Sequence, residues 1–450
     1  MMHVGTTGRI VRDVLSMGGG RLVAVCLSVV QVVYLTRWLS LTEYGLCASM
    51  AVLGVGGLML AAIGARIGNE LTATLARETP DDASVRNRRL FLATFVVLAS
   101  AAALLIVSIL LIDDFLPWQA LIKTGDERLL REAKTGVMVG LVGQIAALPF
   151  GLAVFGFRAY HENEVVAAQT VLSALVTLVM LILARLAPRP LVLAMAAPFL
   201  ANLLISVVMF AGFVRRRRWP LRPIGDPWQE VQAHATGSGL FALLGASFAF
   251  LTYTLPYAVS LTQGFAVAGA IDVYLKLFAI VLLVEGDMLA PLWPAYVAHR
   301  EIDAWPWIRR SLRISLAMAG GMAAAASFGI WLLGPHVVHY LTGLNLPLSS
   351  GTYAGLAIYT LLYSLTLALS TFLNASDLVG IQAAATAAGA LCMLWLSVTL
   401  GRVYGPSGAI VGVGIAMGLI LSVLVARTMV ELGAHRHAAG KLSCDDAASV

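Results

Sequence analysis

The chain has 450 residues, of which 59% are hydrophobic and only 12% are charged. Soluble domains carry about 25% charged residues, and a soluble globule this apolar could not cover its surface with polar groups. The composition therefore excludes an ordinary soluble enzyme and predicts a protein whose solvent is lipid. The formal net charge of +6 then concerns orientation in the membrane, not binding to nucleic acid.

Twelve apolar runs are long enough to span a bilayer as helices, which takes about 20 residues each. Transmembrane β-strands would be about half as long and would alternate in polarity. The pattern predicts an all-α, polytopic membrane protein with twelve transmembrane helices. The runs cover residues 22–39, 44–64, 90–112, 135–157, 165–186, 191–214, 239–261, 265–289, 312–333, 352–373, 379–400 and 408–426.

Arginine and lysine are distributed unevenly between the two sides of such a helical bundle. Twenty of the 30 lie in segments on the side of the N-terminus, and eight lie in segments on the other side. Because positive residues accumulate on the cytoplasmic side, we expect a multi-pass protein of the bacterial inner membrane with both termini in the cytoplasm.

A basic, proline-rich segment divides the chain after the sixth run. It predicts an N-terminal six-helix lobe (residues 1–214), a cytoplasmic linker (215–238) and a C-terminal six-helix lobe (239–427). Two such halves would be parallel repeats, because an even number of crossings restores the orientation. The polar tail (428–450) is expected to be disordered.

The eighth run carries three ionisable residues. Asp272 and Lys276 lie four residues apart, and therefore on one face of a helix, while Glu285 lies nearer the cytoplasmic end. Ionised groups are costly in hydrocarbon, so we expect them to face the bundle interior or a watery cavity. In one interpretation Asp272 or Glu285 takes up a proton or cation and Lys276 attracts an anionic substrate group. In the other, Asp272 and Lys276 only neutralise each other.

Two arginines at the ends of spans could extend this pathway. Arg21 opens the first span and could point into a central cavity, or it could reach back to the membrane interface. Arg66 ends the second span and could line a cytoplasmic vestibule, or it could anchor the helix end.

Polar amides and prolines interrupt several spans. Gln31, Gln144, Asn202 and Gln382 can bond to neighbouring helices or to sugar hydroxyls, and interhelical bonds are the use we expect. Prolines are expected to bend the fourth, sixth and seventh spans and to end the eighth, because proline lacks a backbone donor. The prolines are at positions 149, 198, 256, 291 and 294.

Several kinds of chemistry lack their sequence signatures. The chain contains none of the patterns GxxxxGK[ST], GxSxG and HExxH. Its four cysteines have no CxxC spacing, so neither a metal site nor a cofactor is expected. We therefore expect a transporter and not an enzyme.

Three segments resemble the bacterial polysaccharide-export flippases, which belong to the multidrug/oligosaccharidyl-lipid/polysaccharide exporter (MOP) superfamily. They are LTRWLSLTEYGLCASMAVLGVGGLML (35–60), the segment AVAGAIDVYLKLFAIVLLVEGDMLAPLW and its continuation to 313, and FLNASDLVGIQ with the following residues to 416. The resemblance implies two six-helix lobes around a central cavity, and alternating access for a lipid-linked oligosaccharide. In that family, a cationic cavity commonly suits the diphosphate link or acidic sugars.

The function expected from these observations is to flip a polyprenyl diphosphate sugar from the cytoplasmic to the periplasmic leaflet, for cell-surface polysaccharide export. Membrane lipid and the lipid-linked glycan would be its partners, together with a glycan polymerase and glycosyltransferases. One alternative is a cation-coupled small-molecule or drug exporter of the same superfamily. Another is a membrane-embedded glycan polymerase or ligase, although such enzymes carry a large periplasmic loop and the longest outer loop here, 113–134, is short.

Overall fold

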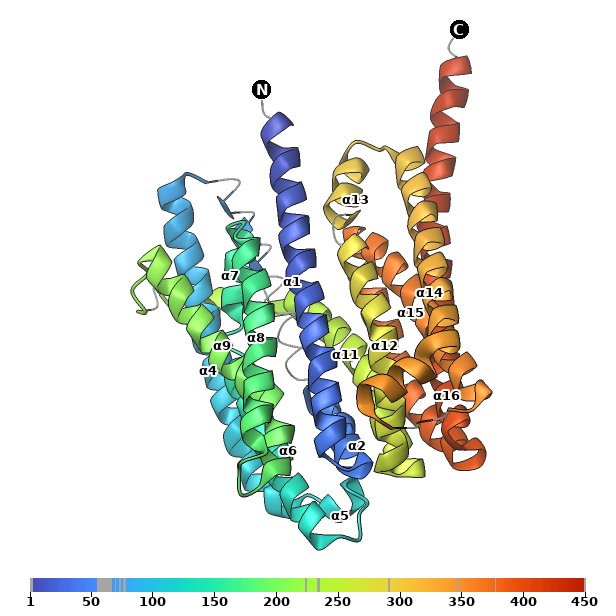
Figure 1. Ribbon diagram of the computed structural model, residues 1–450. Coiled ribbons are helices and arrows are strands. Elements are labelled where there is room, and N and C mark those ends of the chain that lie inside the picture. The colour runs from blue at the N-terminus through green and yellow to red at the C-terminus, as the bar shows by residue number, and fades with distance from the viewer. Residues whose placement is uncertain are drawn as a thin grey trace. The chain divides into compact units, whose positions relative to one another are not determined.

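The structure is a computed structural model that describes residues 3–54, 67–68, 70–72, 74–75, 78–222, 225–232, 235–289, 292–344, 346, 348–376 and 378–448. These residues form helices and connecting turns, with no strand among them (Figure 1). Ten of the helices are long and apolar enough to cross a membrane. The chain is therefore a multi-pass, all-α membrane protein, as its composition predicts.

The helices follow the expected spans in order, and α12 coincides with the eighth span at both ends. The second half of the second span, from residue 55 onward, lies outside the described residues. The elements are α1 (His3–Trp38), α2 (Leu41–Met50), η1 (Ala51–Gly54), α4 (Pro80–Ile112), η2 (Asp113–Phe115), α5 (Trp118–Leu121), α6 (Glu127–Ala147), α7 (Leu152–Ala159), α8 (Asn163–Ala184), α9 (Pro190–Arg217), α10 (Pro227–Gln232), α11 (Ala235–Gln263), α12 (Phe265–Leu289), α13 (Leu292–Glu301), α14 (Trp305–Thr342), α15 (Ser350–Ala375) and α16 (Val379–Ala448).

Glycine and proline divide two of the helical stretches. The fourth span is split into α6 and α7 around Pro149, as expected from the donor that proline lacks. Within α16, Gly405 adopts φ 66° and ψ −153°, which breaks the helix into the expected eleventh and twelfth spans. In contrast, Pro198 and Pro256 lie inside continuous helices, α9 and α11.

The C-terminal residues differ from the sequence-based expectation. The backbone of α16 is helical to Ala448, where the polar composition predicted a disordered tail from residue 428. Alanine, leucine and lysine are strong helix formers, and the expectation gave polarity more weight than this local preference.

Short polar residues define where several helices begin. The hydroxyl of Ser40 accepts a hydrogen bond from the backbone N–H of Glu43 (3.3 Å), and the Glu43 carboxylate accepts one from the backbone N–H of Ser40 (2.8 Å). This reciprocal pair satisfies two donors that a helix start otherwise leaves free. Thr79 and Ser349 cap α4 and α15 by accepting one backbone N–H each, and Asp126 caps α6 by accepting the N–H groups of Arg128 and Leu129.

The chain forms two compact units, Met1–Ala270 and Ile271–Val450, with the boundary inside α12. We refer to them as the N-terminal and C-terminal units. The sequence predicts a different division, into two lobes of six spans each, of which the first ends at residue 214 and the second begins at residue 239. That division stays a prediction.

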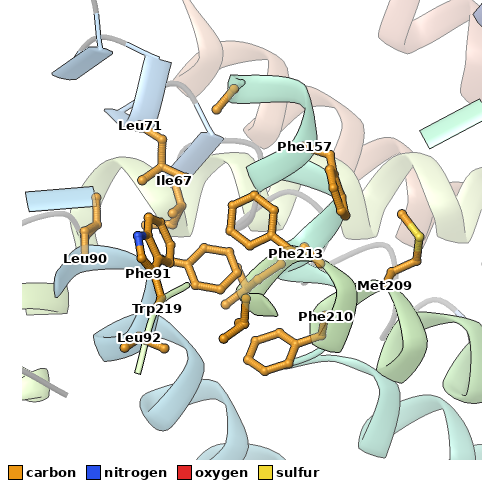
Figure 2. Packing of buried hydrophobic residues seen from close by; sticks show 14 of the residues in the cluster. Ile67, Leu71, Leu90, Phe91, Leu92, Phe157, Met209, Phe210, Phe213 and Trp219 are labelled. Carbon is orange, nitrogen blue, oxygen red and sulfur yellow. The ribbon is translucent and has the colours of Figure 1, made fainter. Parts of the chain in front are cut away.

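An aromatic cluster forms the core of the N-terminal unit, near the ends of α4, α7 and α9 (Figure 2). Phe213 is fully buried, with ring centroids 4.9 Å from Phe91, 5.1 Å from Phe157 and 5.4 Å from Trp219. Tilted and edge-to-face pairs of this kind stabilise the packing beyond their buried area. The cluster joins helices that are distant in sequence into one unit.

The C-terminal unit is built on contacts of α15 with α14, α13 and α16. Tyr296 of α13 packs edge-on against Phe372 of α15, with centroids 5.7 Å apart, and its hydroxyl lies 3.4 Å from that of Ser315 on α14. These contacts fix three helices of the unit to one another.

The polar amides expected to join helices do so. Each bridges two helices of one unit, which confirms their predicted use as interhelical contacts. Gln31 donates a hydrogen bond to the carbonyl of Ala174 (2.7 Å), Asn202 donates one to the side chain of Gln144 (3.5 Å), and Gln382 donates one to the side chain of Asn374 (3.0 Å).

Candidate substrate and ion site

Tyr274 fixes α12 within the C-terminal unit. Its ring is fully buried and packs edge-on against Tyr353 of α15, with centroids 5.2 Å apart. Its hydroxyl donates a hydrogen bond to the carbonyl of Leu346 (3.1 Å). Tyr274 thereby sets the rotation of α12 about its axis, and so decides where the ionisable residues of this helix lie.

The predicted pair of Asp272 and Lys276 is formed. The Lys276 ammonium donates a hydrogen bond to the Asp272 carboxylate, one helical turn away on α12. The side chain of Asp272 is 11% exposed and that of Lys276 is 43% exposed. The pair is thus buried at its anionic end and accessible at its cationic end, where an anionic ligand could reach it.

Glu285 lies on the opposite face of α12 from Lys276, since nine residues correspond to about half a turn beyond two full turns. Glu285 is 0% exposed, like Tyr274 eleven residues earlier on the same face. Within the described part of the chain, neither of its carboxyl oxygens has a hydrogen-bond partner. The structure therefore separates Glu285 from the Asp272–Lys276 pair and encloses it within the C-terminal unit.

One polar group faces the Glu285 carboxyl. It is the hydroxyl of Ser364 on α15, although the geometry of a hydrogen bond is not formed. The neighbouring residues of α12 make apolar contacts: Leu367 of α15 lies 3.9 Å from the β-carbon position of Gly286, and Leu289 packs against α14 and α15.

Of the two arginines that the sequence suggests for the pathway, the structure describes Arg21 and not Arg66. Arg21 is described and half-buried on α1, which packs along α8 (Figure 1). Arg158 of α7 is its like-charged neighbour in the N-terminal unit. Arg66 lies outside the described residues.

Sequence reasoning missed the residues that surround the eighth span. Tyr353 and Ser364 belong to α15, about 80 positions after Asp272, and nothing local connects them to α12. A signal for Glu285 was present: Tyr274, Phe278, Glu285 and Leu289 follow a helical period of 4, 7 and 4, which is the pattern of a buried face. A glutamate at one of these positions lies on the buried face of the helix, together with the apolar residues.

No protein-family model and no curated protein sequence matches the chain. Solved structures do match it. A multidrug resistance MATE family transporter of the MOP superfamily, in an inward-facing conformation, aligns with a TM-score of 0.73 and 12% identity over 92% of this chain and 96% of its own. The lipid II flippase MurJ, in an inward closed conformation, aligns with a TM-score of 0.69 and 10% identity over 92% of this chain and 87% of its own. A mutant of the Vibrio cholerae MATE transporter VcmN aligns with a TM-score of 0.64 and 12% identity over 94% and 97%.

The chain has the fold of the MOP-superfamily transporters. Identities near 12% support the fold alone. Within the MOP fold, the similarity extends to a protein named as a multidrug transporter and to one named as a lipid flippase. The fold agrees with the superfamily expected from the sequence, and by itself it does not choose between a flippase and an exporter.

Proposed function

We propose that this protein flips a lipid-linked oligosaccharide, a polyprenyl diphosphate sugar, from the cytoplasmic to the periplasmic leaflet of the bacterial inner membrane by alternating access. The observation that carries the proposal is the fold, which matches MATE transporters and the lipid II flippase MurJ over more than nine-tenths of the chain. The segments that resemble polysaccharide-export flippases direct the choice of substrate. The flipped product would supply cell-surface polysaccharide export.

The substrate needs a protein because its head is polar. Moving hydroxyls and a diphosphate through hydrocarbon would strip them of water without replacing their hydrogen bonds, at several kcal/mol for each group. A helical bundle with a hydrated interior can hold the head while the polyprenyl tail stays in the bilayer. Helices that rearrange around such a site change the leaflet to which it opens.

The residues we assign to the pathway are those that bring charge into or next to the spans. The half-exposed ammonium of Lys276 would attract the diphosphate, and one of the two acids of α12, Asp272 or Glu285, would take up a cation or proton as the substrate leaves. Arg21 would add positive charge near its like-charged neighbour Arg158. Arg66 is proposed from its position in the sequence.

A cation-coupled exporter of small molecules or drugs is the second candidate. The similarity to MATE transporters, with a TM-score of 0.73, favours it. A glycan polymerase or ligase is less consistent with the chain, since the segment between α4 and α6 contains only the short elements η2 and α5. The same vesicle experiment separates the first two candidates.

The test is reconstitution of the purified chain in vesicles that contain a fluorescent polyprenyl diphosphate sugar. A membrane-impermeant quencher reports how much label lies in the outer leaflet, and flipping is expected to make all of it accessible. The Lys276→Met variant is the matched control, because it removes the positive charge and keeps an unbranched side chain. Uptake of a cationic dye by the same vesicles, without movement of the lipid-linked sugar, would replace the proposal with the drug exporter.

A further inference from the structure

Glu285 is unlike the other intramembrane acid of α12. Asp272 has an ammonium partner on its own helix, whereas the carboxyl of Glu285 is completely enclosed and has no hydrogen-bond partner among the described residues. One turn further along α12, Leu289 packs against Ala319 of α14 and Ala368 of α15. Glu285 therefore belongs to the interior of one unit.

The surroundings of Glu285 contain no counter-charge within the described part of the chain. Both of its carboxyl oxygens are buried, and neither has a hydrogen-bond partner among these residues. Its own helix carries the Asp272–Lys276 pair on another face, while the side chain of Asp287 is not among those described. The titratable and charged residues on the helices that pack nearby are Tyr353, Tyr359 and Tyr363 of α15, Arg309, Arg310, Arg313, His336 and His339 of α14, and His299 and Arg300 of α13.

Three of the arginines among these residues have other partners or border a pocket. Arg310 of α14 borders a pocket of about 440 Å³ that also contains Met288, and Arg309 donates a hydrogen bond to the carbonyl of Leu432 (3.1 Å). Arg300 of α13 donates to the carbonyl of Ala375 (3.3 Å). None of these cations neutralises Glu285.

An enclosed acid without a counter-charge is stable only in its neutral form, because an ionised carboxylate there would lose its hydration and gain nothing in return. A bound metal cation fits poorly as well. Hard cations such as Mg²⁺ and Ca²⁺ take six or more oxygen ligands, whereas the described surroundings of Glu285 offer the single hydroxyl of Ser364. A proton needs no such cage.

We propose that Glu285 is the proton-binding site of the transport cycle: it is protonated in the present conformation and releases its proton when α12 separates from α14 and α15 and water reaches it. The proton comes from water on the side with the higher proton concentration. It leaves to water on the other side, so that no charge is left in the enclosed state. This inference rests on the proposed transport function and specifies its coupling ion as a proton held by Glu285, not by Asp272.

Infrared spectroscopy of the purified full-length chain tests the protonation directly. Exposed aspartate and glutamate side chains ionise near pH 4, so the carbonyl stretch of a neutral carboxylic acid at pH 7 identifies a buried acid. We expect this band in the wild type, its loss in Glu285→Gln and its retention in Asp272→Asn. Absence of the band from the wild type, or its persistence in Glu285→Gln, would overturn the proposal.

Two further measurements make this result specific. Ser364→Ala removes the one hydroxyl that faces the acid and is expected to shift the band without abolishing it, which also provides an assignment if Glu285→Gln does not fold. Replacing sodium by potassium or choline is expected to leave the band unchanged. A band that disappears when sodium is added would show that Glu285 binds a metal cation, and would overturn the proposal.

Transport in vesicles provides the second arm. Wild-type flipping is expected to accelerate at least several-fold under an imposed pH gradient, and Glu285→Gln is expected to lose this acceleration. Flipping that responds equally to the gradient in both proteins would overturn the proposal. If wild-type vesicles move no lipid-linked sugar at all, the proposed substrate fails, whereas the infrared band still decides whether Glu285 holds a proton.

Discussion

Asp272 and Lys276 form an ion pair whose two ends lie in different surroundings. The carboxylate side chain is 11% exposed and the ammonium side chain is 43% exposed, although the residues are only one turn apart on α12. An anionic ligand could therefore compete for the ammonium group without first exposing the carboxylate. Whether the pair exchanges partners or only neutralises charge is decided by the variants below.

Asp272→Asn is expected to reduce flipping at least about tenfold, which corresponds to about 1.4 kcal/mol, and to leave a folded protein. The amide keeps the shape of the side chain but leaves Lys276 without its carboxylate. The measurement is the rate at which the fluorescent lipid-linked sugar becomes accessible to quencher, with thermal unfolding in detergent as the control for folding. Full activity of this variant would remove Asp272 from the mechanism.

The double variant Asp272→Asn with Lys276→Met separates the two interpretations of the pair. If the pair acts in transport, the double variant is as inactive as either single variant. If the two residues only neutralise each other, removing both charges is expected to restore activity, because no unpaired ion is left in the apolar helix. Flipping rates of the three variants, compared at equal amounts of folded protein, give the answer.

Gly45→Ala is expected to destabilise the N-terminal unit. A β-carbon at Gly45 would lie 1.7 Å from the carbonyl oxygen of Phe265 and 2.9 Å from the backbone nitrogen of Gly269. Both are backbone atoms, so the helices α2 and α12 must move apart at this crossing, at about 1–3 kcal/mol. The temperature of thermal unfolding in detergent measures the effect.

Gly212→Ala is the matched control for this prediction. Gly212 lies inside α9, and nothing lies within 4 Å of its β-carbon position. Alanine is a better helix former than glycine by about 0.8–1 kcal/mol, so this variant is expected to be slightly more stable than the wild type. Equal effects of the two substitutions would contradict the close approach at Gly45.

Phe213→Ala is expected to lower the free energy of unfolding by roughly 3 kcal/mol or more, since it leaves a cavity among buried aromatic rings (Figure 2). Phe328→Ala is the control, because that ring on α14 is 62% exposed. Chemical unfolding of both variants in detergent measures the difference. A loss at Phe213 no larger than at Phe328 would show that the cluster does not stabilise the N-terminal unit.

Ser40→Ala is expected to destabilise the start of α2 by about 1 kcal/mol, because it removes the hydroxyl that accepts the N–H of Glu43. Ser40→Asn is expected to retain most of the stability, since asparagine also caps helices well. Hydrogen exchange at the first amides of α2 gives a local readout. Unchanged exchange in Ser40→Ala would mean that the reciprocal hydrogen bonds of Ser40 and Glu43 are not formed in the protein.

Local features of the sequence determined the helices and the pair on α12. The length of each apolar run gave the spans, and the ends of α12 agree with those expected. Asp272 and Lys276 meet because residues four apart on any helix share a face, and Gly405 breaks α16 because glycine tolerates a backbone conformation closed to other residues. In each case the cause lies within a few residues of the effect.

Tertiary structure alone decided how the ionisable residues of α12 differ. Glu285 and Asp272 look alike in the sequence, as acids inside one apolar run. They differ because Tyr274 packs against Tyr353 and holds one face of the helix inside the C-terminal unit, where Glu285 is 0% exposed, while Asp272 lies on another face and pairs with Lys276. A residue is buried by neighbours that can lie some 80 positions away in the chain, and no local pattern in the sequence specifies those neighbours.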